Sequence, residues 1–278
     1  IRLCAPRLRG DECLAAAVAV QRLLESGGGG CRVAASSAAA SLIHRLAQRM
    51  RGEPSNSTLL VQCLACLARG LLGEASRTVL LEHCGPAMKQ AQRFSFREMA
   101  SVCLSLEAID MQHTSLHEFM EQRRDALLAT SRMQALLEEL LAGSTGNVPS
   151  YLLTSEAAER QLRDVFLSRL ASLKDKAAEA FDDPFQCFSL LIELQELPTF
   201  YLEAMAFWAK RETRRQVAGK ADPKRMLITG VRLCLLDDAL EARKLQGLAR
   251  ANMDIAILTY MQLEGSSVAV PAEDLQRE

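Results

Sequence analysis

The stretch FSFREMASVCLSLEAIDMQHTSLHEFM, residues 94–120, predicts one complete helical hairpin. Ser95 is suited to cap a helix that begins near Phe96, and Glu98 holds the third position of a capping box. Apolar residues then recur at steps of three and four, the spacing of one helix face: Met99, Val102, Cys103, Leu106 and Ile109. The first helix is therefore expected over Phe96–Ile109.

The second half of the stretch supplies the returning helix. Asp110–Ser115 is polar enough to form a turn. A second apolar stripe follows it, made by Leu116, Phe119, Met120, Leu127 and Leu128. Two helices joined by so short a turn form an αα-hairpin.

At these residues the stretch resembles the heptatricopeptide-type, octotricopeptide-like repeats of organellar RNA-associated proteins, which include the RAP-domain and FAST-kinase-domain families. The first helix of such a repeat runs F, two or three variable residues, E-L-A, two apolar residues and an A-L-A-like step before G or D. Ser105 and Glu107 depart from the usual small residues. The positions that meet the pattern are Phe94, Glu98, Met99, Ala100, Val102, Cys103, Leu106, Ile109 and Asp110.

Further helical pairs are predicted before and after this hairpin. Four glycines, Gly27–Gly30, separate a helix over Cys13–Leu24 from one over Ala35–Met50, because each glycine costs a helix interior about 1 kcal/mol. The next hairpin has one helix capped by Ser57 or Thr58, whose apolar face runs from Leu60 to Leu71, and a second that begins near Ser76.

The C-terminal half predicts three more pairs. Helices are expected over Arg132–Leu141 and Ser155–Phe181, separated by a loop at Gly143–Ser150. Asp183-Pro184 and Asp222-Pro223 each combine an N-cap residue with proline at the first helical position, so each opens a new pair. The helix after Pro198 completes one pair, and the last helix is expected to end near Leu263.

Equivalent apolar residues recur along the chain at Val20, Leu67, Leu106, Leu194 and Leu233, at intervals of 47, 39, 88 and 39 residues. A period near 40 is typical of helical solenoids. We therefore predict an all-α fold, an α-solenoid of about six antiparallel helical hairpins over residues 1–264, followed by a polar tail over residues 265–278. An irregular helical bundle is the alternative architecture.

Composition bounds the class of protein. The chain has 278 residues, 49% of them hydrophobic but only 5% aromatic, which favours closely packed helices. Its nine cysteines are scattered through apolar stripes, so we expect most of them to be reduced core thiols and expect no metal. No apolar run is long enough for a membrane helix. The chain starts at Ile1 rather than Met, and we expect a processed or trimmed chain whose targeting peptide, if removed, leaves no trace.

Motifs for catalysis or metal binding are weak. Cys63 and Cys66 form a C-x2-C without a second pair, and core packing explains them better than zinc. His113 and His117 have helical ligand spacing but span the expected turn and lack an accompanying glutamate. The glycine run lacks the lysine of a phosphate-binding loop. We predict no catalytic residues, no metal and no cofactor.

Charge is more informative, because residues 205–232 contain eight Lys or Arg against two acids in a chain of net charge −1. Lys210 with Arg214 and Arg211 with Arg215 form like-charge i,i+4 pairs, whose repulsion an anionic phosphate backbone would relieve. A solvated basic helix end is the simpler alternative, and Trp208 is expected in the core. The predicted RNA-binding residues are Lys210, Arg211, Arg214, Arg215, Lys220, Lys224 and Arg225.

A helical solenoid offers an extended surface rather than an inherent active site. The resemblance implies a non-catalytic subunit of a mitochondrial ribonucleoprotein in the matrix, either the mitochondrial ribosome or an RNA-processing complex. Its partners would be ribosomal or other mitochondrial RNA and several protein subunits, with no membrane. Near-neutral net charge favours a subunit embedded among proteins over a free-standing RNA binder. The alternative is a HEAT- or armadillo-like scaffold that binds protein only.

Overall fold

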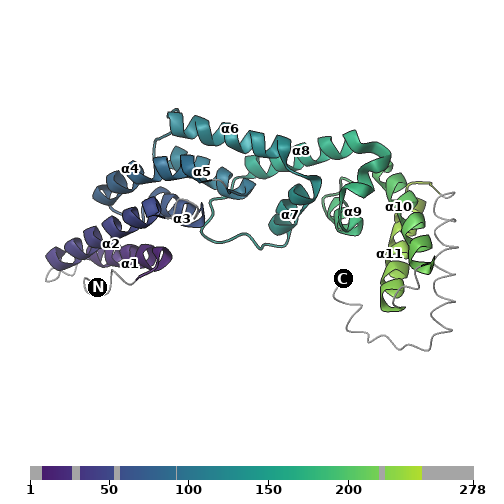
Figure 1. Cartoon of the computed structure of the whole chain (residues 1–278), viewed down its shortest axis with the longest axis horizontal. Coiled ribbons are helices and arrows are strands. Elements are labelled where there is room, and N and C mark those ends of the chain that lie inside the picture. Colours follow the sequence, from purple (N-terminus) through teal and green to yellow (C-terminus); the bar gives the residue numbers. More distant parts are fainter. Residues whose placement is uncertain (1–7, 27–31, 53–56, 92, 219–222, 246–278) are drawn as a thin grey trace. The chain divides into compact units, whose positions relative to one another are not determined.

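The computed structural model describes residues 8–26, 32–52, 57–91, 93–218 and 223–245. Every regular element in those residues is helical, comprising eleven α-helices and one 3-10 helix, and no strand occurs among them (Figure 1). The predicted all-α class is therefore confirmed. The expected tail at 265–278 and the helix end near Leu263 lie outside the described residues.

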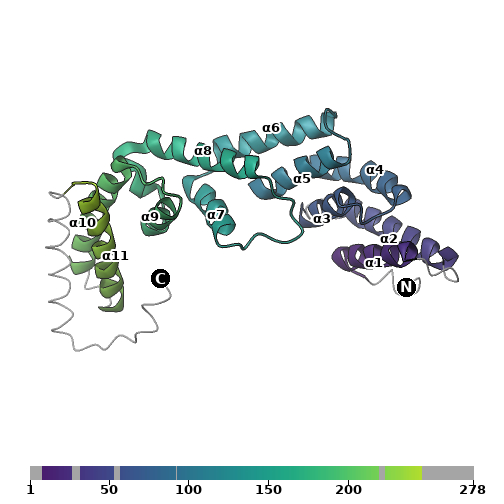
Figure 2. The same ribbon diagram turned by 180° about the vertical axis from the view of Figure 1, so that it is seen from behind.

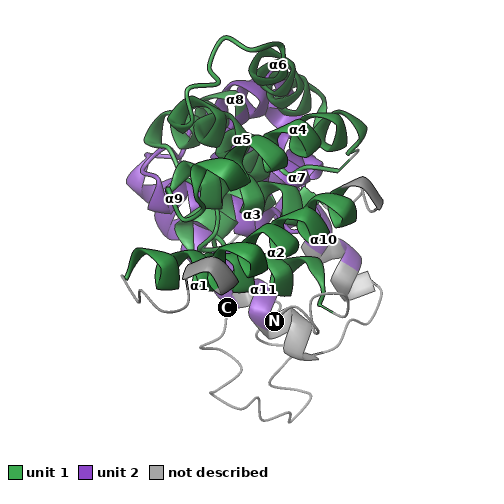
Figure 3. Cartoon of the chain, turned by 90° about the vertical axis from the view of Figure 1, so that its left-hand side faces the viewer, with its two compact units in different colours: residues 1–132, 138–165 green, residues 133–137, 166–278 purple. Residues whose placement is uncertain are grey.

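The chain forms two compact units (Figure 3). Unit 1 comprises residues 1–132 and 138–165, and unit 2 comprises residues 133–137 and 166–278. The boundary passes through two helices, α7 (Met133–Ser144) and α8 (Glu156–Leu173), so each contributes residues to both units.

Six further helices build unit 1. Consecutive helices pack as pairs, α1 on α2, α3 on α4 and α5 on α6 (Figures 1 and 2). Corresponding helices of neighbouring pairs also contact each other. The first helices do so, since α3 contacts both α1 and α5, and the second helices α2 and α4 are also in contact. The bounds are α1 Gly10–Glu25, α2 Arg32–Gly52, α3 Ser57–Ala68, α4 Glu74–Gln90, α5 Phe96–Ala108 and α6 Ser115–Thr130.

The hairpin predicted from residues 94–120 is formed by α5 and α6. Ser95 caps α5 as expected, since its Oγ accepts a hydrogen bond from Glu98 N at 3.2 Å. The Glu98 carboxylate in turn accepts from Ser95 N at 2.9 Å, which completes the capping box. Thr114 then caps α6 by accepting from His117 N.

Four helices share one kind of C-terminal end, a residue in the left-handed region closed by the same pair of backbone hydrogen bonds. Gly70, Asp110, Gln195 and Lys244 have φ of 66°, 56°, 57° and 60° and follow α3, α5, α9 and α11. After α5, Asp110 N donates to Glu107 O and Met111 N donates to Leu106 O, the bond pair of a Schellman motif. The same pair of bonds recurs after α3, α9 and α11.

One apolar cluster fills unit 1. It takes residues from α1 to α6 and from the segment before α8, where Leu152 is buried. Cys63, Leu64, Cys84 and Leu106 are fully enclosed. The cluster is built mainly from Leu, Ala, Cys and Met, in keeping with the low aromatic content of the chain.

Unit 2 is richer in aromatic contacts. It contains η3 (Lys174–Ala180), α9 (Pro184–Glu193), α10 (Thr199–Ala218) and α11 (Pro223–Ala242). Asp183 caps α9 as predicted, with its Oδ1 accepting from Phe185 N at 3.1 Å and Pro184 at the first helical position. Tyr201 is fully buried, and its hydroxyl donates to the Pro184 carbonyl at 2.9 Å.

The continuous helix expected over Ser155–Phe181 is wrong. The α-helix stops at Leu173, Lys174 adopts a φ of 49°, and the chain continues as the 3-10 helix η3. Ala177 and Ala178 are fully buried, and η3 packs against α10. This close approach depends on contacts in space, which sequence periodicity does not report.

The repeat register predicted from the leucines also fails in places. Leu67 and Leu106 lie within α3 and α5, whereas Leu194 is the C-cap of α9 and only half-buried. Leu71, expected on the face of α3, follows the left-handed Gly70 and lies beyond the helix. Glycine favours that conformation and ends the helix despite the continuing apolar pattern.

A buried arginine links α5 to α8 within unit 1. Arg97 is 6% exposed, and its Nη2 lies 2.7 Å from Glu159 Oε2. Glu139 accepts from Phe96 N at 3.2 Å beside it, and burial raises the pKa of the Glu139 carboxyl against the attraction of Arg97. Gly143 leaves room here, because a Cβ at that position would overlap the Arg97 guanidinium.

The left-handed helix ends predict a stabilising substitution. Gln195 is exposed and pays the cost of positive φ, which glycine does not. Gln195→Gly should raise the free energy of unfolding by about 0.5–1 kcal/mol, measured by urea denaturation. Gln195→Ala, which keeps a Cβ, is the matched control and should bring no gain. Equal effects of the two variants would contradict the strain.

The ion pair of Arg97 with Glu159 predicts that replacing its two members will lower the free energy of unfolding by different amounts. Glu159→Ala leaves a buried guanidinium without its closest counter-charge and should cost about 2 kcal/mol of unfolding free energy. Arg97→Met removes the buried charge and leaves Glu159, whose side chain is 38% exposed, to be hydrated, so it should cost about half as much or less. Urea denaturation measures both variants. A larger loss for Arg97→Met would overturn this account.

Candidate nucleic-acid interface

The predicted basic run begins on α10, whose two faces differ sharply. Its inner face is fully or almost fully buried and carries Tyr201, Leu202, Met205 and Ala209. The helix α10 contacts η3 and α11, and α11 lies beside it in Figures 1 and 2. The helix is thereby fixed with its opposite face toward solvent.

We call the second surface the outer face of α10 and define it by Phe207, Lys210, Arg211 and Arg215. Lys210 and Arg211 follow Phe207 at three and four residues, and Arg215 follows Arg211 at four, so they are neighbours on the helix. Phe207 is 63% exposed, Lys210 is half-buried, and the side chains of Arg211 and Arg215 are 65% and 84% exposed.

Two acids hold these arginines loosely. Arg211 Nη1 lies 2.7 Å from Oε1 of Glu179, which belongs to η3. Both side chains are about half exposed or more. Arg215 Nη1 is 4.0 Å from Glu212 Oε2. Exposed pairs of this kind are worth less than about 1 kcal/mol each, so the guanidinium groups can exchange these partners for a phosphate.

The other predicted RNA-binding residues are placed less fully. Arg214 lies in α10, and Lys224 and Arg225 lie in the first turn of α11, but their side chains are outside the described part of the structure. Lys220 lies outside the described residues altogether. The structure therefore brings Lys210, Arg211 and Arg215 together on one helix and leaves the grouping of the rest a prediction.

The aromatic residues of α10 show what sequence reasoning missed. Trp208 is half-buried and packs edge-on against Phe185, with ring centroids 5.8 Å apart. The preceding residue, Phe207, is the exposed aromatic beside the basic side chains. Its position four residues before Arg211 and three before Lys210 was visible in the sequence, but the inward face of α10 was not.

Several arginines outside α10 donate hydrogen bonds to backbone carbonyl groups. Arg69 donates to the Ser150 carbonyl at 3.0 Å, Arg123 to Met88 at 3.4 Å and Arg243 to Leu197 at 3.1 Å. Arg77 likewise donates to the carbonyl of Ile109, the C-cap of α5. These groups join helix ends and loops within their own unit, so their sequence positions carry structural rather than binding information.

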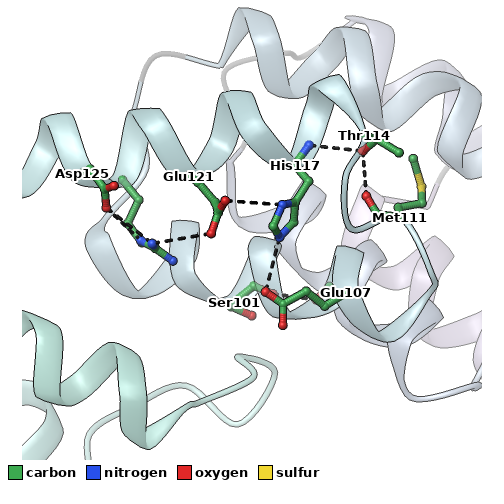
Figure 4. Close-up of polar contacts among 9 residues, drawn as sticks. Ser101, Glu107, Met111, Thr114, His117, Glu121 and Asp125 are labelled. Carbon is green, nitrogen blue, oxygen red and sulfur yellow. Dashed lines mark hydrogen bonds and ion pairs between the residues drawn. The ribbon is translucent and has the colours of Figure 1, made fainter.

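The two histidines, His113 and His117, lie in different environments. His113 is exposed in the turn, whereas His117 is 7% exposed on α6. Figure 4 shows the His117 ring between two carboxylates, with Nε2 3.3 Å from Glu107 and Nδ1 3.6 Å from Glu121. Glu107 is on α5, so His117 links the two helices of the hairpin. Within the described ranges, no cluster of three or more metal-ligating side chains occurs.

Five of the seven cysteines that the structure describes are buried. Cys63 is fully buried, and burial raises its pKa well above the ordinary value. Burial also raises the pKa of both Cys84 and Cys187 to about 12. Cys66 is half-buried with a raised pKa, and Cys234 is exposed. Cys4 and Cys31 lie outside the described residues.

Comparison with known proteins finds no matching family model, no matching curated protein and no matching solved structure. In the part of the chain that the structure describes, no helix is both long and apolar enough to cross a bilayer.

The cysteine environments predict ordered reactivity toward iodoacetamide. The thiolate is the reacting form, so Cys234 should be alkylated in the folded protein while Cys84 and Cys187 remain protected until unfolding. Peptide mass spectrometry after labelling with and without urea measures the order. Native labelling of Cys84 or Cys187 as fast as Cys234 would refute the enclosed packing.

Proposed function

We propose that this chain is a non-catalytic helical-repeat subunit of a mitochondrial ribonucleoprotein, either the mitochondrial ribosome or an RNA-processing complex in the matrix. It contacts RNA through the outer face of α10 and neighbouring proteins through other surfaces. The single observation that carries the RNA contact is the grouping of Phe207, Lys210, Arg211 and Arg215 on one solvent-facing side of α10.

The helix contacts in unit 1 support the finer architecture, an α-solenoid of about six hairpins. In a solenoid each repeat buries its apolar face mainly against adjacent repeats. Contacts of α3 with α1 and α5, and of α2 with α4, follow that scheme. The shared Schellman ends of α3, α5, α9 and α11 add a recurring local feature in both units.

The chemistry of the outer face suits an anionic partner such as nucleic acid. Guanidinium groups bind phosphate oxygens in a bidentate manner. Phosphate contacts set affinity without reading sequence, which suits a subunit held in place by surrounding proteins. Net charge of −1 over the whole chain agrees with such a local contact.

The second candidate, a HEAT- or armadillo-like scaffold that binds protein only, is favoured by a different feature. Unit 1 has an open groove of about 780 Å³ between α1, α2 and α4. Leu24, Ile43 and Val79 give it apolar walls, and Ser37 and Ser41 add hydroxyl groups. Such a groove suits a peptide or helix.

Salt dependence separates the two functions. Replacing Arg211, Arg214 and Arg215 by Gln should weaken RNA binding to a similar degree across RNA sequences and flatten the slope of log affinity against log salt by up to about 3. Gln preserves helix propensity, so circular dichroism should remain unchanged. Fluorescence anisotropy with labelled RNA at several salt concentrations measures the slope.

A matched control removes the same charge elsewhere. Arg22, Arg93 and Arg132 are exposed, and their replacement by Gln should leave the salt slope unaltered. Crosslinking within the native complex then locates the contact. Absence of RNA crosslinks to the unsubstituted chain, together with loss of a protein partner in the α10 variant, would favour the scaffold.

A further inference from the structure

The exposed ring of Phe207 needs a partner that tolerates two cations beside it. Lys210 and Arg211 lie one helical turn further along the same face, and Glu179 holds the Arg211 guanidinium at 2.7 Å. An apolar protein surface that covered Phe207 would also desolvate these charges, which is costly. The partner must therefore combine a flat apolar group with a nearby anion.

A nucleotide meets both requirements in one unit. Its base offers a π-face to the Phe207 ring. Its phosphate is separated from the base by one sugar, and the cations of α10 are separated from Phe207 by one helical turn, so one nucleotide can contact both. Stacking on an aromatic side chain tolerates every base, because each has such a face. Glu203 is exposed one turn before Phe207, so the backbone phosphates are favoured on the opposite side, toward Arg211 and Arg215.

Duplex RNA does not fit this surface equally well. Paired bases are already stacked on their neighbours, and proteins contact A-form helices mainly through phosphates and 2′-hydroxyl groups. An exposed ring on a convex helix meets only a base that is unpaired.

We propose that Phe207 is a stacking platform for an unpaired RNA base, so that the outer face of α10 selects single-stranded over duplex RNA. This rests on the proposed function, because the phosphates of the same strand occupy Lys210, Arg211 and Arg215. The ring supplies affinity without charge, and the cations supply affinity without discrimination between strands.

The test uses the full chain with Phe207→Leu, which keeps apolar bulk and removes the π-face. The probes are a fluorescein-labelled oligouridine of about 12 nucleotides, within the site size of single-strand binders, and a blunt RNA duplex of the same length. Phe207→Leu should weaken oligouridine binding about 5- to 150-fold. Duplex binding should change less than about twofold, and the salt slope should not change, because no phosphate contact is lost.

Leu235→Ala is the matched control, since Leu235 is an exposed apolar residue of α11 in the same unit. It should leave binding of both probes unchanged. Trp208, the only tryptophan, reports by its fluorescence that each variant keeps the packing against Phe185.

The outcomes separate this inference from the proposed function. If Phe207→Leu binds oligouridine as the unsubstituted chain does, while Gln at Arg211, Arg214 and Arg215 flattens the salt slope, the phosphate contact stands and the stacking platform is refuted. An equal loss for single strand and duplex also refutes stacking. If the unsubstituted chain binds neither probe, both proposals fall.

Discussion

The reversal of the chain after a helix is the constraint on which this fold depends. Four helices, α3, α5, α9 and α11, end with one residue at positive φ and the same two backbone hydrogen bonds. These bonds satisfy carbonyls that a helix end would otherwise leave exposed, and they turn the chain sharply. The next helix in unit 1 can then lie against its predecessor, as α4 does on α3 and α6 on α5.

Such turns allow a core built mainly from Ala, Leu, Cys and Met rather than from aromatic rings. Short connections hold the helices of unit 1 close, and small or flexible side chains fill the narrow space between them. Enclosure has a chemical consequence, because it raises the pKa of thiols such as Cys63 and Cys84 and suppresses the thiolate. The cysteines of the described core are thus chemically quiet packing residues.

Local features were predictable from sequence, and features set by distant contacts were not. The capping box of Ser95 with Glu98 and the Asp183-Pro184 helix start depend on residues within one turn, so their patterns identified them correctly. The break after Leu173 depends on the packing of η3 against α10, which lies further along the chain. Apolar spacing continued through that break and therefore predicted too long a helix.

The candidate site shows the same division between local and distant causes. The basic character of α10 followed directly from the sequence, but the outward direction of Phe207 rather than Trp208 is decided by Phe185, which contacts the indole ring from α9. Adjacent helix positions point about 100° apart, so the element that packs on α10 determines which aromatic ring reaches solvent. Because Tyr201 and Met205 fix the buried face, Phe207 points to solvent, and Lys210 and Arg211 lie within about one helical turn of it. The combination of π-face and positive charge that defines the proposed interface is therefore a product of packing on the inner side of the same helix.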